Sequence, residues 1–332
     1  MSINTELEGP SPEPRPQETS ASPVPIQGKE MSKAALEFPP SFKSTEQAIA
    51  SAGQSDAREV GSVSPDATSS GLRTQGVTSA GIQAGLQGPR INAREIWGQP
   101  TFYEGTFENQ NSTGGVRSFT YDSKFYVQCE RWLKFWYDNN PWLSPVWVVS
   151  FGVQVNKTGW HGTGQAFDLT RLYAKRPDTG NFSQIFYADW RDWHTSSAAA
   201  WYAKLYWGTV ASLTYFFDVV LTYSYDDSPK DSHQNHVHFD VSENVSSGGA
   251  WLLGRWHSSR SQITNMQYIL LHCWGIHSVK GTHAYDNATK AAAAAVMKRV
   301  GRPGRLPSDS QNDWLHFHHA SWQHANGRHV YP

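Results

Sequence analysis

The sequence predicts an α+β fold in which a small antiparallel sheet with flanking helices is followed by a C-terminal three-helix module and preceded by a disordered tail. Residues 1–90 almost lack the side chains that build a core. Residues 91–250 alternate between short β-rich runs and amphipathic helical patterns, whereas residues 251–332 show helical patterns alone. These three observations predict a tail, one α+β domain and one helical module, in that order.

The tail has the composition of a chain that does not fold by itself. Residues 1–90 contain no Trp, Tyr, His or Cys and only two Phe, yet they hold 10 of the 18 prolines. Such a segment buries too little apolar surface to offset the conformational entropy lost on ordering. We expect residues 1–90 to be disordered, either as a solvated linker or as a loading signal for a delivery apparatus.

The first helix expected in the α+β domain spans residues 122–141. Ser123 can cap its start, an apolar stripe that includes Trp132 and Trp136 repeats at helical spacing, and a proline ends it. The Gly/Asn/Thr-rich stretch 91–120 before it is expected to be irregular. The other elements expected here are strands at 145–155, 165–173, 216–225 and 236–242 and a helix at 198–213.

The C-terminal module is expected to consist of three helices. They are predicted at residues 261–275, 287–301 and 310–322. Gly275 and Gly301 end the first two, because glycine readily adopts the left-handed conformation that terminates a helix. A module of this length is near the lower end of ordinary domain size.

Composition and charge exclude several classes of protein. The 332-residue chain carries a formal net charge of −1, so it has no basic field for nucleic acid or anionic lipid. No apolar run reaches the length of a membrane span, and the N-terminus lacks a signal peptide. We expect a soluble product that reaches its site of action by lysis, non-classical export or injection. Cys129 and Cys273 are too few for a disulfide framework and are expected as buried thiols.

Two short motifs carry candidate chemistry, HGTGQAFD at 161–168 and HQNHVHFD at 233–240. Two imidazoles and one carboxylate can hold a catalytic zinc and leave a fourth position open for water. Non-haem iron uses the same donors, but its sites usually place His and carboxylate two apart on one strand, and the interval of seven from His161 to Asp168 fits that poorly. The alternative is that these are ordinary polar residues of a sheet.

The strand pattern shows how such a site could assemble. Residues i and i+2 of a strand share a face, so His236 and His238 point one way while their apolar neighbours point into the core. Two neighbouring strands would bring His238 beside Asp168. Gly164 permits a tight turn that folds His161 back over the sheet.

The paired motifs resemble the superfamily of lysostaphin-type peptidases, D-Ala-D-Ala metallopeptidases and hedgehog-like domains, whose pattern is HxxGxAxD followed by HxH. The His-x-x-His-x-His form of the second motif is most similar to penicillin-insensitive murein endopeptidases and extensin-like relatives. The resemblance covers residues from about 120 to 245. It implies that His161, Asp168 and His238 bind zinc, that His236 acts as base or oxyanion stabiliser, and that His233 is an accessory group.

Two positions depart from the family pattern. Gly159 stands where a serine often precedes the first histidine, and Gln154 stands where many relatives carry an arginine. Arginine can bind a substrate's terminal carboxylate through two hydrogen bonds, whereas neutral Gln154 can only polarise a carbonyl. This difference favours cleavage inside a peptide bridge over removal of a terminal D-Ala.

Two further carboxylates, Asp240 and Glu243, belong to or follow the second motif. Either could orient a histidine by a hydrogen bond. We expect both instead at a solvated strand end.

Residues 266–299 resemble a three-helix peptidoglycan-binding repeat. Such repeats have a Q-x-x-L-like first helix, a V-x-G loop and a second helix of the pattern G/N-x-T-x-x-A-V. The corresponding residues here are Gln267, Leu270, Val279, Gly281, Thr289 and Val296. The alanine run in this stretch could equally be plain helix-forming sequence. Surface or packing roles, rather than metal binding, are expected for the late histidines His316, His318, His319, His324 and His329.

The resemblance implies a zinc-dependent peptidoglycan peptidase, most simply an endopeptidase, with peptidoglycan as its partner. A tail without a signal peptide fits a lytic enzyme released at lysis or a toxin effector loaded into a delivery apparatus. A D-Ala-D-Ala carboxypeptidase and a non-catalytic, zinc-containing wall-binding protein are the alternatives.

Overall fold

The computed structural model describes seven stretches of the chain: residues 88–107, 116–139, 146–154, 159–175, 182–225, 233–241 and 253–328. The tail expected to be disordered, residues 1–90, lies almost entirely outside the described residues. Among the helices that are described, none combines the length and apolar character needed to cross a bilayer.

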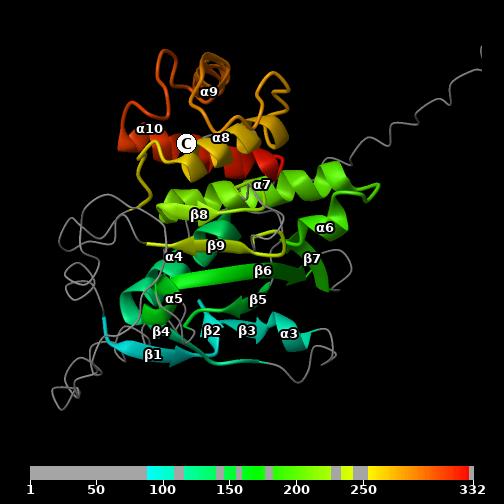
Figure 1. The fold of residues 1–332 in the computed structure, drawn as a ribbon, viewed down its shortest axis with the longest axis vertical. Helices are drawn as coiled ribbons and strands as arrows, with labels where there is room; N and C mark the ends of the chain where they lie inside the picture. Colours follow the sequence, from blue (N-terminus) through cyan, green and yellow to red (C-terminus); the bar gives the residue numbers. More distant parts are fainter. Residues whose placement is uncertain are drawn as a thin grey trace, which may run out of the picture. The chain divides into compact units, whose positions relative to one another are not determined.

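A seven-stranded sheet runs through the centre of the fold (Figure 1), in the order β2-β3-β5-β6-β9-β8 with β7 also paired to β6. Only β3 and β5 run parallel; the other neighbouring pairs are antiparallel. The predicted α+β class with an antiparallel sheet is therefore confirmed. The strands of this sheet are β2 (Glu95–Ile96), β3 (Gln99–Tyr103), β5 (Val146–Gly152), β6 (Ala166–Lys175), β7 (Phe182–Tyr187), β8 (Val219–Leu221) and β9 (Val237–Asp240).

The expectation that residues 91–120 are irregular was wrong for the parts of this stretch that the structure describes. This stretch contains β1 (Arg90–Ala93), β2, β3, the short helix α3 (Glu104–Phe107) and the start of β4 (Phe119–Asp122). β1 pairs with β4, and β3 pairs with β5 more than forty residues later in the chain. Because these strands are short and are stabilised by partners distant in sequence, their local composition does not identify them.

Helix α4 (Ser123–Asp138) matches the predicted helix, but its cap is Asp122 and not Ser123. Asp122 has extended backbone angles, and its carboxylate accepts hydrogen bonds from the backbone N–H groups of Lys124 (2.9 Å) and Phe125 (3.2 Å). Ser123 already lies in the first turn. An aspartate just before the first helical residue satisfies two of the N–H groups that have no partner within the helix.

Helices α4 and α7 (Ala199–Phe216) cover one face of the sheet. Phe239 of β9 packs against Trp132 of α4, with ring centroids 5.5 Å apart. The two helices are joined by buried hydrogen bonds, from Trp132 Nε1 to Ser212 Oγ (3.0 Å) and from Trp136 Nε1 to Thr209 Oγ1 (3.2 Å). The predicted apolar stripe of α4 thus faces the core, and buried indoles find polar partners there.

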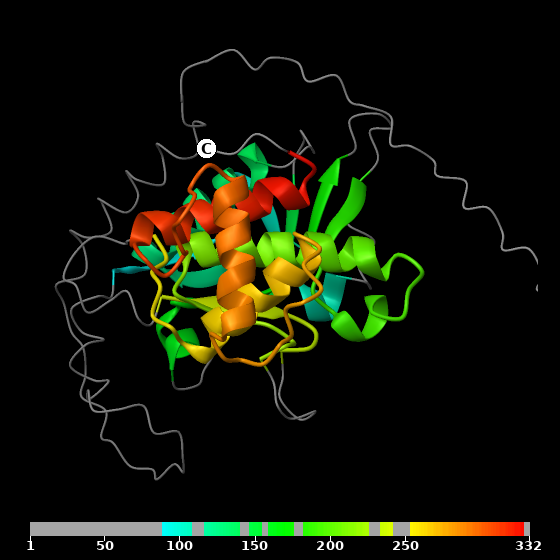
Figure 2. The same cartoon turned by 90° about the horizontal axis from the view of Figure 1, so that it is seen from above.

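The three predicted C-terminal helices are present as α8 (Arg260–His272), α9 (Asn287–Arg299) and α10 (Gln311–Ala325). Gly301 follows α9 with a left-handed φ of 84°, as expected for a helix stop. Helix α10 lies directly on α7: a Cβ added at Gly208 would come within 2.5 Å of the Ala325 side chain. The helices share one compact unit with the sheet, and α9 and α10 lie on the side of α7 away from the sheet (Figures 1 and 2). The boundary predicted near residue 251 falls outside the described residues.

The late histidines pack against other groups, as the sequence predicted. His316 donates from Nε2 to the Val300 carbonyl at 3.0 Å, and His324 stacks on Trp274 at 4.1 Å. His318 is fully buried beside the Trp314 ring, and burial lowers its pKa to about 3. His329 lies outside the described residues. Cys129 and Cys273 are buried thiols, also as predicted.

Replacing His318 by leucine is expected to make the protein more resistant to acid. Because the folded-state pKa of His318 lies below its ordinary value of 6.5, the unfolded chain binds more protons between these two pH values. The contribution of neutral, buried His318 to the free energy of unfolding is therefore fully present above about pH 6.5. It falls by up to about 1.4 kcal/mol per pH unit as the pH is lowered toward 3. Denaturant unfolding between pH 7 and 4 should show a shallower loss for His318→Leu than for wild type. A slope equal to that of wild type, or an equal change in a variant at the exposed His277, would contradict this role.

Candidate metal centre

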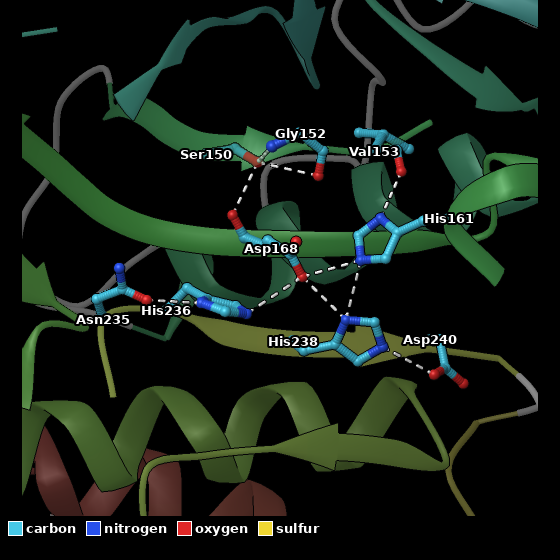
Figure 3. A network of polar contacts seen from close by, with 9 residues as sticks. All are labelled: Ser150, Gly152, Val153, His161, Asp168, Asn235, His236, His238 and Asp240. Atoms are coloured by element: carbon cyan, nitrogen blue, oxygen red, sulfur yellow. Dashed lines mark hydrogen bonds and ion pairs between the residues drawn. The ribbon is translucent and has the colours of Figure 1, made fainter. Parts of the chain in front are cut away.

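The two histidine motifs meet on the face of the sheet opposite α4 (Figure 3). Asp168 of β6 and His238 of β9 are direct partners in the antiparallel ladder. Their neighbours Phe167 and Phe239 stack on each other at 5.3 Å on the core side. The alternation of each strand therefore places the carboxylate and the imidazole side by side on the other face, as the sequence pattern predicted.

His161 reaches this face from α5 (Trp160–Thr163), a single helical turn between β5 and β6. The turn ends at Gly164, which has a left-handed φ of 74°. A Cβ added at Gly164 would lie 2.8 Å from the backbone nitrogen of Asp122. Both the conformation and the close backbone contact require glycine here. The predicted role of Gly164 in folding His161 back over the sheet is thus confirmed.

Three donor atoms converge at the centre. His161 Nε2 lies 3.1 Å from Asp168 Oδ1 and 3.1 Å from His238 Nδ1, and the last two atoms are 2.9 Å apart. Tetrahedral bonds of about 2.0–2.1 Å separate two ligands of one zinc ion by about 3.3 Å. The donors are therefore close to the spacing that a first-row metal ion requires, and His161, Asp168 and His238 form a possible metal-binding triad.

The outer ring nitrogens fix which tautomer each histidine adopts. His161 Nδ1 donates to the Val153 carbonyl at 2.6 Å. His238 Nε2 donates to Asp240 Oδ2 at 3.0 Å. With the outer nitrogens donating, a neutral ring directs a lone pair at the Asp168 carboxylate, and a ring donates to that carboxylate only when it takes up a second proton. Three lone-pair donors that face one another are stabilised only by a proton or a cation placed between them.

The charges at the centre favour a cation. Burial favours a neutral Asp168, but hydrogen bonds from His161 and His238 and the nearby imidazoles outweigh it and hold its pKa well below the ordinary value. Burial likewise disfavours a charged His238, yet hydrogen bonds to Asp168 and Asp240 raise its pKa to about 9. The carboxylates thus draw a proton onto the ring, and a metal ion can take the place of that proton.

Asp240 does not have the solvated position expected for it. Asp240 is only 3% exposed, and its carboxylate orients His238 by accepting a hydrogen bond from its Nε2. The expectation failed because β8 covers this end of β9, pairing Val219 with Asp240. Glu243 lies outside the described residues.

Replacing Asp240 by asparagine should weaken metal binding roughly 10- to 100-fold, as loss of a carboxylate behind a metal-ligating histidine commonly does. The amide can still accept from His238, but it removes the negative charge that favours this tautomer. Competition with a chromogenic chelator measures the affinity, with Asp138→Asn on the surface of α4 as control. Unchanged affinity in Asp240→Asn would show that Asp240 does not support a metal ligand.

His236 lies at the edge of the centre. Its Nδ1 donates to Asn235 Oδ1 at 2.9 Å, which leaves Nε2 with a lone pair 3.6 Å from Asp168 Oδ1. The edge of the Phe151 ring contacts it, with centroids 5.9 Å apart. Burial lowers the pKa of His236 to about 4, so the ring is neutral at pH 7. A neutral imidazole with its lone pair at the centre can accept a proton.

The other two predicted site residues lie one step further out. The His233 ring centroid is 5.2 Å from that of His236 and 6.0 Å from that of His238. Gln154 donates from Nε2 to the Gly162 carbonyl at 3.3 Å, so it contacts the α5 turn beside His161. The structure therefore brings His233 to the histidine cluster and Gln154 to the backbone that carries His161.

Sequence reasoning missed three groups that hold the centre in place. These are the Val153 carbonyl, the Asn235 amide and the hydroxyl of Ser150, which donates to the Asp168 carbonyl at 2.8 Å and accepts from the Gly152 N–H at 2.9 Å. Ser150 joins β5 and β6 where their register shifts, directly behind Asp168. A carbonyl carries no sequence signal, but the position of Asn235 inside the second motif could have indicated a role.

Comparison of the chain with protein-family models, with curated proteins and with solved structures finds no match.

Proposed function

We propose that this protein is a zinc-dependent peptidase that hydrolyses amide bonds of peptidoglycan, as an endopeptidase. The observation that carries the proposal is the convergence of His161 Nε2, Asp168 Oδ1 and His238 Nδ1 within about the ligand spacing of one metal ion. Two imidazole nitrogens and one carboxylate oxygen suit zinc, whereas calcium and magnesium prefer oxygen donors alone. Three protein ligands leave a position open, as in catalytic rather than structural zinc sites.

Zinc held by these residues supplies Lewis acidity that activates a water and polarises the scissile carbonyl. His236 accepts the proton of the attacking water at Nε2 and passes it to the leaving amine. Its lone pair faces the centre, and its pKa of about 4 keeps it neutral before the reaction. Asn235 holds the ring in the required tautomer. His233, next to His236 in the cluster, is an accessory group near the substrate.

The substrate assignment is supported by sequence features. The two motifs resemble those of murein peptidases, and residues 266–299 resemble a wall-binding repeat. Gln154 beside α5 carries no charge to pair with a terminal carboxylate, which favours cleavage within a cross-bridge or stem peptide over removal of a terminal residue. We further propose that the protein reaches the wall as a lytic enzyme or as an injected toxin effector.

Digestion of purified sacculi tests this function. Zinc-loaded wild type and His161→Ala are incubated with sacculi of several peptidoglycan types, and the released fragments are identified by mass spectrometry. We expect new amide cleavage with wild type and none with His161→Ala. Absence of fragments from every wall type, with zinc bound, would refute the peptidase and leave a non-catalytic wall-binding protein.

A further inference from the structure

An open cavity of about 280 Å³, with both polar and apolar walls, lies among the helices, on elements that contribute nothing to the metal centre. Its walls come from the end of α7, the loop after α9, and α10, which packs on α7 (Figure 2). The volume is just below the roughly 300–1,000 Å³ of pockets that enclose drug-sized ligands, so it suits a small ligand or the end of a polymer. The residues that line it are Tyr215, Arg302, Asn312, Leu315, His316 and His319.

The polar walls of this cavity offer hydrogen-bond donors around one positive charge. Arg302 donates from Nη1 to Asp313 at 3.0 Å, and Asp313 itself is 1% exposed behind the wall. Asn312 accepts from Arg302 Nη2 at 3.0 Å when its amide is oriented to do so, and its NH₂ group can then donate to a ligand. Tyr215 adds a hydroxyl. None of the lining residues is acidic. The cavity is therefore complementary to an anion.

The charge and the apolar surface of the cavity restrict the class of ligand that it can bind. Burial, followed by the proximity of Arg328, lowers the pKa of His319 to about 4, so this ring is neutral at pH 7. Among the described residues that line the cavity, the Arg302 guanidinium is the one cationic group, and it already pairs with Asp313. It therefore suits a carboxylate with one negative charge better than a phosphate with two. Leu315 and the Tyr215 ring, which stacks on Phe135 at 4.7 Å, give the cavity an apolar side. These features fit a carboxylate attached to small apolar groups.

We infer that this cavity binds the terminal carboxylate of a short peptide. Arg302 and Asn312 hold the carboxylate, and Leu315 and Tyr215 contact the side chains next to it. If the proposed function holds, the ligand in the wall is the end of a stem peptide, and the helices anchor the enzyme beside the bonds it cuts. Binding itself does not depend on hydrolysis at the metal centre.

Calorimetric titration with D-alanyl-D-alanine tests the inference. The zinc-loaded full-length chain carries His236→Ala so that turnover does not contribute. We expect saturable binding that weakens at least tenfold in Arg302→Gln, and at least tenfold when the dipeptide is replaced by its C-terminal amide. Arg305→Gln is the matched control, because Arg305 also pairs with Asp313, at 2.7 Å, but does not line the cavity. Its affinity should stay within twofold of the parent.

The inference is overturned if the dipeptide shows no saturable binding at millimolar concentration, or if it binds no better than its amide. It is also overturned if Arg302→Gln and Arg305→Gln lose equal affinity for the dipeptide, or if inorganic phosphate binds more tightly than the dipeptide. Thermal melts of both variants show whether each is folded. The titration measures binding, whereas sacculus digestion measures cleavage. If the protein binds the dipeptide but releases no fragments from sacculi, only the proposed function is refuted.

Discussion

Replacing Asp168 by alanine is expected to reduce zinc affinity by roughly a hundredfold or more and to abolish hydrolysis. Structural zinc sites with four ligands contribute about 10–16 kcal/mol, so one ligand is worth about 3 kcal/mol or more. Asp168 also supplies the negative charge that His161 and His238 face at 3.1 and 2.9 Å. Without it, two neutral rings remain, and they hold a divalent ion poorly. Chelator competition measures the affinity, and fragment release from sacculi measures the activity.

The matched control for Asp168→Ala is Asp192→Ala, which removes an exposed carboxylate that accepts a hydrogen bond from the Tyr187 hydroxyl. It should keep the affinity and the activity of wild type. If Asp168→Ala binds zinc as tightly as wild type while remaining folded, the three residues are an ordinary polar cluster of the sheet and the metal assignment fails.

Replacing His236 by alanine is expected to lower kcat by roughly 10²–10⁴-fold, the usual contribution of a general acid–base group, while zinc remains bound. His236 lies outside the converging triad, with its Nε2 3.6 Å from Asp168 Oδ1. Its loss therefore removes a proton acceptor but no metal ligand. Kinetics on a synthetic cross-bridge peptide, with zinc content measured on the same samples, separates the two effects.

The control for His236→Ala is His277→Ala, at an exposed position in the loop between α8 and α9. The His277→Ala variant should have the same kcat as wild type. Loss of zinc in His236→Ala would make His236 a ligand, and unchanged kcat would remove it from the proposed chemistry.

The face of the sheet on which each central donor lies could be predicted, because it depends on local rules. Alternation along β6 and β9 places Asp168 and His238 on one face, and Gly164 closes the turn that returns His161. Helical sequence patterns likewise located α4, α7 and the three C-terminal helices. In each case the signal lies within one short stretch of sequence.

The features that could not be predicted depend on contacts between distant segments. Strands β1 and β3 are defined by their pairing with β4 and β5, and Asp240 becomes buried because β8 lies beside it. The Val153 carbonyl that orients His161 has no side-chain signal at all. The cap of α4 was misplaced by one residue because Asp122 and Ser123 both suit that role, and only the backbone angles distinguish them.

The proposed function requires that His161, Asp168 and His238 hold one zinc ion, and the metal content of the purified chain shows whether they do. Wild type and His238→Ala are dialysed against zinc and then against metal-free buffer, and zinc is measured by mass spectrometry of the elements. About one zinc per chain in wild type and almost none in His238→Ala is the predicted result. A wild-type chain that retains no zinc, or a variant that retains as much as wild type, would contradict the claim.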